Sequence, residues 1–155
     1  MNKLAFGRDN EANLVELLRQ SKVFAPNLSL VATFDNEIVG HNLFTKIRTI
    51  NDDKVETESL ALAPMAVKPT FQYRGIGGQL IKHGLEKARE LQYKSVTVLG
   101  HEHYYPKFGF APANKWNIKS PYDVPANGFM AVELVADGLK NASGLVKYPK
   151  EFETV

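Results

Sequence analysis

The sequence contains no cysteine, which excludes disulfides, a cysteine nucleophile and a cysteine-ligated zinc or iron–sulfur site. It also lacks an apolar run close to the ~20 residues that cross a bilayer, and its first residues lack the basic and apolar segments of a secretory signal. The net charge of +2 is too small to indicate binding to nucleic acid or to an acidic membrane surface. We therefore expect a cytoplasmic protein with no metal, nucleic-acid or membrane partner.

The composition is that of an ordinary globular domain. Hydrophobic residues make up 44% of the chain and charged residues 23%, both close to average. A chain of 155 residues is long enough to bury one sizeable core. No repeat, low-complexity stretch or linker rich in proline and glycine divides it. We therefore expect residues 1–155 to form a single domain.

The hydrophobic patterns predict antiparallel strands followed by a β-α-β unit with a parallel pair of strands. This order is typical of an α/β domain with a mixed sheet. The predicted strands span residues 28–34, 37–50, 55–67, 95–99 and 128–135, and the predicted helices span 11–21 and 76–91. A short helix ends at Gly109, and the tail from Ala136 has no clear pattern.

The helix over 76–91 has an apolar stripe and a charged opposite face, as expected for a helix packed on a sheet. Pro64 interrupts the strand before it, and proline cannot donate to a ladder, so we expect a bulge or an unpaired edge there. His83 lies on the polar side of the helix, and His41 lies within a strand; both are interpreted as structural. The stripe consists of Ile76, Leu80, Ile81, Leu85, Ala88 and Leu91.

Three glycines, Gly75, Gly77 and Gly78, lie where this strand gives way to the helix. A glycine costs a helix roughly 1 kcal/mol relative to alanine, so a cluster of them needs a reason. A Walker loop is excluded, because no Lys-Ser/Thr pair follows Gly78. A dinucleotide fingerprint fits poorly, because Leu80 takes its third glycine position and no acidic residue ends the strand over 95–99.

An anion site remains, in which bare backbone of the first helical turn contacts a bulky phosphate group. The N–H groups of a first turn have no partner inside the helix, and the helix dipole favours negative charge there. Close packing of the helix against its sheet would also favour glycine, and the glycines alone leave both readings open.

The segment AVKPTFQYRGIGGQLIKHGLEKA over 66–88 resembles motif A of the GNAT superfamily of acetyl-CoA-dependent N-acetyltransferases. The motif is Gln/Arg-x-x-Gly-x-Gly/Ala, matched by Gln72, Gly75 and Gly77. The segments LSLVATFDNEIVGHNLF, VLGHEHYYPKFGF and PYDVPANGFMAVEL extend the similarity to the bacterial YhbS-like acetyltransferases, so that it covers nearly the whole chain. The resemblance implies the GNAT fold, with the parallel strands splayed apart.

The resemblance also implies acetyl-CoA as the cofactor. Pantetheine would pair with the main chain of the strand before the glycines, in the manner of an added strand. The diphosphate would lie against the turn and the start of the helix, and Arg74 would add positive charge. The implied cofactor contacts are Met65, Ala66, Val67, Gln72, Tyr73, Arg74, Gly75, Ile76, Gly77, Gly78 and Tyr105.

The implied reaction is direct attack of a neutral primary amine on the acetyl thioester, since an acetyl-cysteine intermediate is excluded. The Met65 N–H would stabilise the oxyanion. Tyr105 matches the tyrosine that lies beside the sulfur in the superfamily, where it would hydrogen-bond or protonate the departing thiolate. Aromatic packing is the alternative role for Tyr105, and Tyr104 is interpreted as packing. Trp116 and the loop over 120–125 are candidates for shaping an acceptor pocket.

The general base stays open. Many enzymes of the superfamily carry a glutamate at the position of Ala61, so that role has no counterpart here. The candidates are Glu58, His101, Glu102, His103 and a water molecule.

Comparison with the superfamily pattern leads us to expect that its leading strand is missing from the start of this chain, and an uncovered strand edge would favour association, for example as a homodimer. The acceptor, a small-molecule or peptide amine, cannot be identified from the sequence. A catalytically inactive acyl-CoA-binding or sensing module is the main alternative function, and a dinucleotide-dependent oxidoreductase is the other.

Overall fold

The computed structural model describes residues 28–149, apart from 73–74, 101 and 123. The helix predicted over 11–21 and the question of a missing leading strand lie outside these residues. The strands are β1 Ser29–Phe34, β2 Glu37–Ile50, β3 Glu56–Val67, β4 Ser95–Leu99, β5 Ala111–Pro112, β6 Ile118–Lys119, β7 Phe129–Glu133 and β8 Gly144–Lys147. The helix is α3 Ile76–Glu90, and the short 3-10 helices are η2 Pro69–Phe71, η3 Tyr105–Phe108, η4 Ala113–Trp116 and η5 Ala126–Gly128.

The strands form a mixed sheet, which confirms the predicted α/β class. Their hydrogen-bonded order is β5-β7-β4-β3-β2-β8-β6, and β1 pairs with β2 outside this path. β3 and β4, which flank α3 in the chain, are parallel, whereas β4 and β7 are antiparallel. The chain divides into two compact units, and β2 and β3 each have residues in both. The first unit contains the residues up to Thr45 and Leu62–Lys87, and the second contains Lys46–Ala61 and Ala88–Tyr148. No described helix is long and apolar enough to span a membrane.

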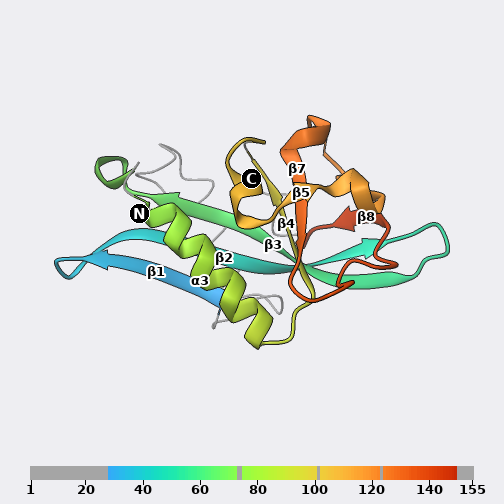
Figure 1. Ribbon diagram of the computed structural model, residues 1–155, viewed down its shortest axis with the longest axis horizontal. Coiled ribbons are helices and arrows are strands. Elements are labelled where there is room, and N and C mark those ends of the chain that lie inside the picture. Colours follow the sequence, from blue (N-terminus) through green and yellow to red (C-terminus); the bar gives the residue numbers. More distant parts are fainter. Residues whose placement is uncertain (1–27, 73–74, 101, 123, 150–155) are drawn as a thin grey trace. The chain divides into compact units, whose positions relative to one another are not determined.

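The first unit is built from a hairpin and a helix packed on it (Figure 1). Asp35 and Asn36 form the hairpin turn with φ values of 51° and 65°, a conformation that these two residue types tolerate better than most. α3 contacts β2, and the buried Asn42 side chain donates a hydrogen bond to the Leu80 carbonyl at 3.0 Å. The hairpin therefore supports the helix whose amino terminus is the candidate anion site.

The apolar stripe predicted for α3 is largely confirmed, with a correction at its end. Leu80, Ile81, Leu85 and Ala88 are buried, and His83 is exposed on the opposite side, as expected. Leu91 was expected in the stripe but is 38% exposed, because α3 ends at Glu90.

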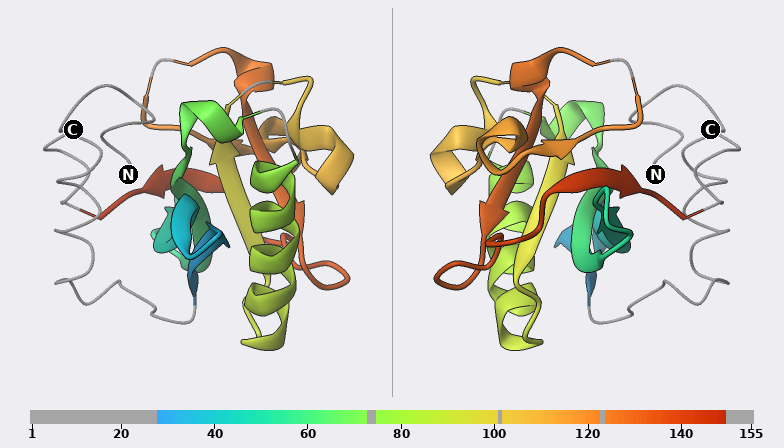
Figure 2. Two further views of the ribbon diagram at one scale, coloured as in Figure 1. Left: turned by 90° about the vertical axis from the view of Figure 1, so that its left-hand side faces the viewer. Right: turned by 90° about the vertical axis from the view of Figure 1, so that its right-hand side faces the viewer.

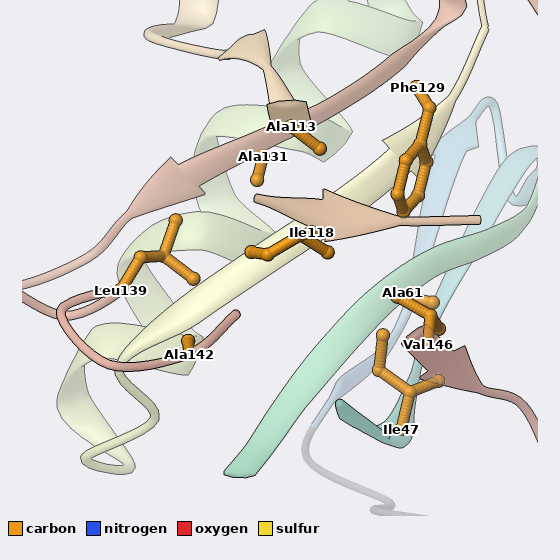
Figure 3. Packing of buried hydrophobic residues seen from close by; sticks show 9 residues of the cluster. All are labelled: Ile47, Ala61, Ala113, Ile118, Phe129, Ala131, Leu139, Ala142 and Val146. Atoms are coloured by element: carbon orange, nitrogen blue, oxygen red, sulfur yellow. The ribbon is translucent and has the colours of Figure 1, made fainter. Parts of the chain in front are cut away.

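The second unit has a core of its own (Figure 3). Figure 2 shows β4 and β7 side by side, and their ladder runs from Ser95↔Glu133 to Leu99↔Phe129. β8, which the sequence patterns did not predict, pairs with the end of β2 from Ile50↔Leu145 to Arg48↔Lys147. The core consists of Ile47, Ala61, Ala113, Ile118, Phe129, Ala131, Leu139, Ala142 and Val146.

A glycine in the middle of α3 generates a test of the packing between helix and sheet. A Cβ at Gly84 would lie 2.2 Å from Cε2 of the buried Phe44 ring. Gly84→Ala should therefore lower the free energy of unfolding by about 1–3 kcal/mol, as overpacked cores do. Chemical denaturation measures the change. His83→Ala, at the exposed neighbouring position, is the control and should stay within about 0.5 kcal/mol of the wild type. Equal stabilities for Gly84→Ala and the wild type would contradict this packing.

Candidate active site

The amino terminus of α3 has the features of an anion-binding helix end. Gly75 has a φ of +81°, a left-handed conformation that glycine adopts without strain. Its carbonyl accepts the N–H of Gln79 at 3.0 Å. The N–H groups of Ile76, Gly77 and Gly78 therefore precede the first intrahelical bond and point out of the helix end. The first turn of α3 carries no acidic residue, so no carboxylate opposes a bound anion there.

The segment that leads into this helix is tied down at several points. The Lys68 N–H donates to the Val39 carbonyl at 2.8 Å, and the Lys68 ammonium pairs with the Glu37 carboxylate. The Gln72 side-chain amide donates to the Val67 carbonyl at 3.0 Å. Gln72, a predicted cofactor contact, is therefore already engaged in holding the turn. Tyr73 and Arg74 lie outside the described residues.

β3 and β4 are joined by a parallel ladder next to the predicted pantetheine segment. Its described pairs are Leu60↔Val96 and Ala61↔Thr97, and the Thr97 hydroxyl donates to the Leu60 carbonyl at 3.3 Å. β3 then runs on to Val67 and includes Pro64, Met65 and Ala66. The expected splaying of the strands and the bulge or free edge at Pro64 stay predictions.

Tyr105 is packed within an aromatic group at the start of η3. Its ring meets Tyr104 and Phe110 edge to face, with centroid distances of 5.1 and 5.8 Å. Gly109 ends this short helix with a φ of +99°, as the sequence predicted. Tyr105 is only 9% exposed, yet no described residue hydrogen-bonds its hydroxyl. The ring is therefore fixed by packing, and the hydroxyl has no hydrogen-bond partner among the residues that the structure describes.

Burial raises the pKa of Tyr105 to about 12, and the neighbouring Tyr104 adds to the effect. The phenol is consequently neutral at physiological pH and carries a proton that it can donate in a hydrogen bond. A cysteamine-type thiol has a pKa of about 8.5, so complete proton transfer from Tyr105 to its thiolate would be uphill. The geometry and the pKa together favour a hydrogen-bond donor over a full acid. Tyr104 packs against Phe108 and Lys107, in agreement with the structural role expected for it.

The candidate bases among the described residues, Glu58, Glu102 and His103, are exposed. Glu58 lies on β3, and Glu102 and His103 face each other at 3.4 Å between Oε1 and Nε2. His101 lies outside the described residues. Ala61 is 3% exposed and belongs to the core of the second unit, so its methyl group serves packing. Trp116 also packs against this core.

The structure thus combines a mixed sheet, a parallel pair of strands on either side of a helix in the chain, and glycines at the start of that helix. The model of the acetyltransferase (GNAT) family matches residues 4–110. The chain belongs to this family and is an acyltransferase by class.

Several N-acetyltransferases are similar to this chain. YjhQ of Escherichia coli (strain K12) is 41% identical over 122 residues, which cover 78% of this chain and 67% of YjhQ. YhbS of the same strain is 30% identical over 149 residues, covering 96% and 86% of the two chains. Both are described as uncharacterised N-acetyltransferases.

Two solved structures share the fold along nearly the whole chain. YhbS from Escherichia coli in complex with CoA has a TM-score of 0.86 at 28% identity, covering 97% of this chain and 82% of that one. An acetyltransferase from Brucella melitensis in complex with acetyl-CoA has a TM-score of 0.77 at 28% identity, covering 97% and 86%. These similarities confirm the predicted superfamily and fold.

The sequence did not indicate the contact between Gly100, which follows β4, and the Tyr105 ring. A Cβ at this position would lie 2.3 Å from Cε2 of Tyr105. A glycine directly after a buried strand was visible in the sequence, but its relation to the tyrosine ring depends on the tertiary structure.

The raised pKa of Tyr105 generates a pH prediction. The unfolded chain loses this proton near pH ~10, whereas the folded protein holds it to about 12. The stabilisation that the Tyr105 phenol contributes is therefore complete at pH values below its pKa in the unfolded chain. It is lost as the pH rises toward its pKa in the folded protein. The loss amounts to about 2 kcal/mol by about pH 12. Urea unfolding at increasing pH, compared between wild type and Tyr105→Phe, isolates this contribution. Parallel stability profiles for the two proteins would show that Tyr105 titrates normally.

Proposed function

We propose that this chain uses acetyl-CoA to acetylate a primary amine. The observation that carries the proposal is the glycine-opened amino terminus of α3, with three N–H groups ahead of the first intrahelical bond and no acidic residue in its first turn. The CoA and acetyl-CoA complexes of the two similar proteins support the same cofactor for this chain. The family match supports the reaction class.

The proposed cofactor contacts fall into two groups. The diphosphate binds the N–H groups of Ile76, Gly77 and Gly78, and Gly75 gives the turn its left-handed geometry. Tyr73 and Arg74 contribute from the segment before the helix, while Gln72 holds its own position through the Val67 carbonyl. The pantetheine arm pairs with the main chain of β3 at Met65, Ala66 and Val67.

The proposed chemistry needs few protein groups. The amine nitrogen attacks the thioester carbonyl carbon, and the Met65 N–H stabilises the negative charge that develops on the carbonyl oxygen. The carbon–sulfur bond then breaks, and the Tyr105 hydroxyl donates a hydrogen bond to the departing sulfur. The amine loses one proton to a base and the thiolate gains one, so that the products are an acetamide and free CoA. Glu58, His101, Glu102, His103 and water stay the alternatives for the base.

The proposal treats residues 1–155 as one domain that acts on a small-molecule or peptide amine. A homodimer and a cytoplasmic location stay predictions. The alternative, an acyl-CoA-binding module without turnover, keeps the cofactor site and is favoured by the apolar Ala61 in place of a basic group.

A thiol-release assay with acetyl-CoA and a panel of small amines and peptides tests the function. We expect amine-dependent release of CoA. Tyr105→Phe should lower kcat by about 10²-fold, as the loss of one preorganised hydrogen-bond donor to a developing negative charge does, with little change in acetyl-CoA affinity because the ring is kept. Phe108→Leu, which alters a ring that packs on Tyr104 and carries no hydroxyl, serves as the control. Binding of acetyl-CoA with no amine-dependent thiol release would favour the module instead.

A further inference from the structure

Gly100 is held in place by the strand pairing of the second unit. Its N–H donates to the Gly128 carbonyl at 2.9 Å, directly beyond the last ladder pair, Leu99↔Phe129. A Cβ on Gly128 would in turn lie 3.4 Å from the Gly100 carbonyl oxygen. The backbone at Gly100 therefore has little freedom to move away from anything that lies against it.

The Tyr105 ring occupies the space that a side chain at Gly100 would need. A Cβ there would lie 2.3 Å from Cε2 and 3.2 Å from both Cδ2 and Cζ, well inside the ~3.5–4.0 Å of ordinary carbon contacts. Cζ carries the hydroxyl, so the contact reaches the reactive end of the ring.

The ring cannot yield easily to such a side chain. Tyr104 and Phe110 meet it edge to face on other sides, and Phe110 is itself only 3% exposed. A displacement of about 1 Å would be needed to restore ordinary contact distances. Such a displacement would rotate the Tyr105 ring toward solvent or disturb its packing against Tyr104 and Phe110.

We propose that Gly100 is a positioning residue, whose bare backbone is the surface that fixes where the Tyr105 hydroxyl lies. It touches neither sulfur nor amine in this role and acts through Tyr105 alone. The inference rests on the proposed function, in which that hydroxyl donates to the departing sulfur. A glycine is required at 100 for catalysis, and not only for folding.

Gly100→Ala tests the inference in the full-length protein. Because a misplacement of about 1 Å can cost on the order of 10²-fold in rate, we expect kcat to fall tenfold or more, with the KM for acetyl-CoA nearly unchanged. The matched control is Gly84→Ala, which forces a similar clash, 2.2 Å from Cε2 of Phe44, against a ring with no proposed part in the reaction. Both variants are assayed at a temperature at which circular dichroism shows them folded.

A double-mutant cycle with Tyr105→Phe separates positioning from a general loss of structure. If Gly100 acts through the hydroxyl, then Gly100→Ala should lower kcat little further in the Tyr105→Phe background. Gly84→Ala should have the same small effect in both backgrounds. Additive losses for Gly100→Ala and Tyr105→Phe, or an unchanged kcat for Gly100→Ala, would overturn the proposal.

A readout independent of turnover distinguishes failure of this inference from failure of the proposed function. Near-ultraviolet circular dichroism at neutral pH reports fixed aromatic rings, and subtracting the Tyr105→Phe spectrum isolates the Tyr105 signal. We expect Gly100→Ala to change this signal and Gly84→Ala to preserve it. An unaltered Tyr105 signal in Gly100→Ala would contradict the positioning role, even if no amine in the panel is acetylated. A changed Tyr105 signal in Gly100→Ala, together with no acetylation of any amine by the wild type, would count against the proposed function. It would still support the contact between Gly100 and the Tyr105 ring.

Discussion

The N–H groups at the start of α3, which have no acceptor within the helix, are the constraint on which the first unit depends. A helix end leaves such groups without partners, and they need an anion, water or a capping group. Gly75, with its φ of +81°, lets the chain turn into the helix at this point. The Lys68–Val39 hydrogen bond and the packing of α3 on β2 fix the direction of that end. In the proposed function, the hairpin thus fixes the direction of the helix terminus that binds the diphosphate.

In the proposed function, the second unit meets a different requirement, which is to keep the Tyr105 phenol buried and still able to donate a hydrogen bond. Desolvation holds Tyr105 neutral, and its aromatic neighbours fix the ring. A donor with so high a pKa stabilises a developing thiolate by a hydrogen bond without giving up its proton early. The same burial that suits the tyrosine for this task also stabilises the fold at neutral pH. The packing and the proposed chemistry therefore both require the Tyr105 side chain to be buried.

The sequence predicted the elements that have a strong local pattern. The β-forming residues of β1 and β2, the glycines before α3 and the helix stop at Gly109 all carry their own signals, and the structure has the expected element at each place. β8 was missed because it is a short strand whose pairing with the end of β2 is set by residues distant in the sequence. Leu91 was misplaced because the helix ends one residue before it.

The candidate site was predictable where it depends on backbone motifs and not where it depends on tertiary contacts. The glycine motif identified the amino terminus of α3, and family resemblance supplied Tyr105. The engagement of Gln72 with Val67 and the contact between Gly100 and the Tyr105 ring could not be inferred, because both depend on where side chains lie in the folded chain. Calorimetric titration with CoA and with pantetheine, which lacks the diphosphate and nucleotide, tests the anion site most directly. The account predicts saturable heat with CoA and much weaker binding of pantetheine; equal affinities, or no heat with CoA, would contradict it.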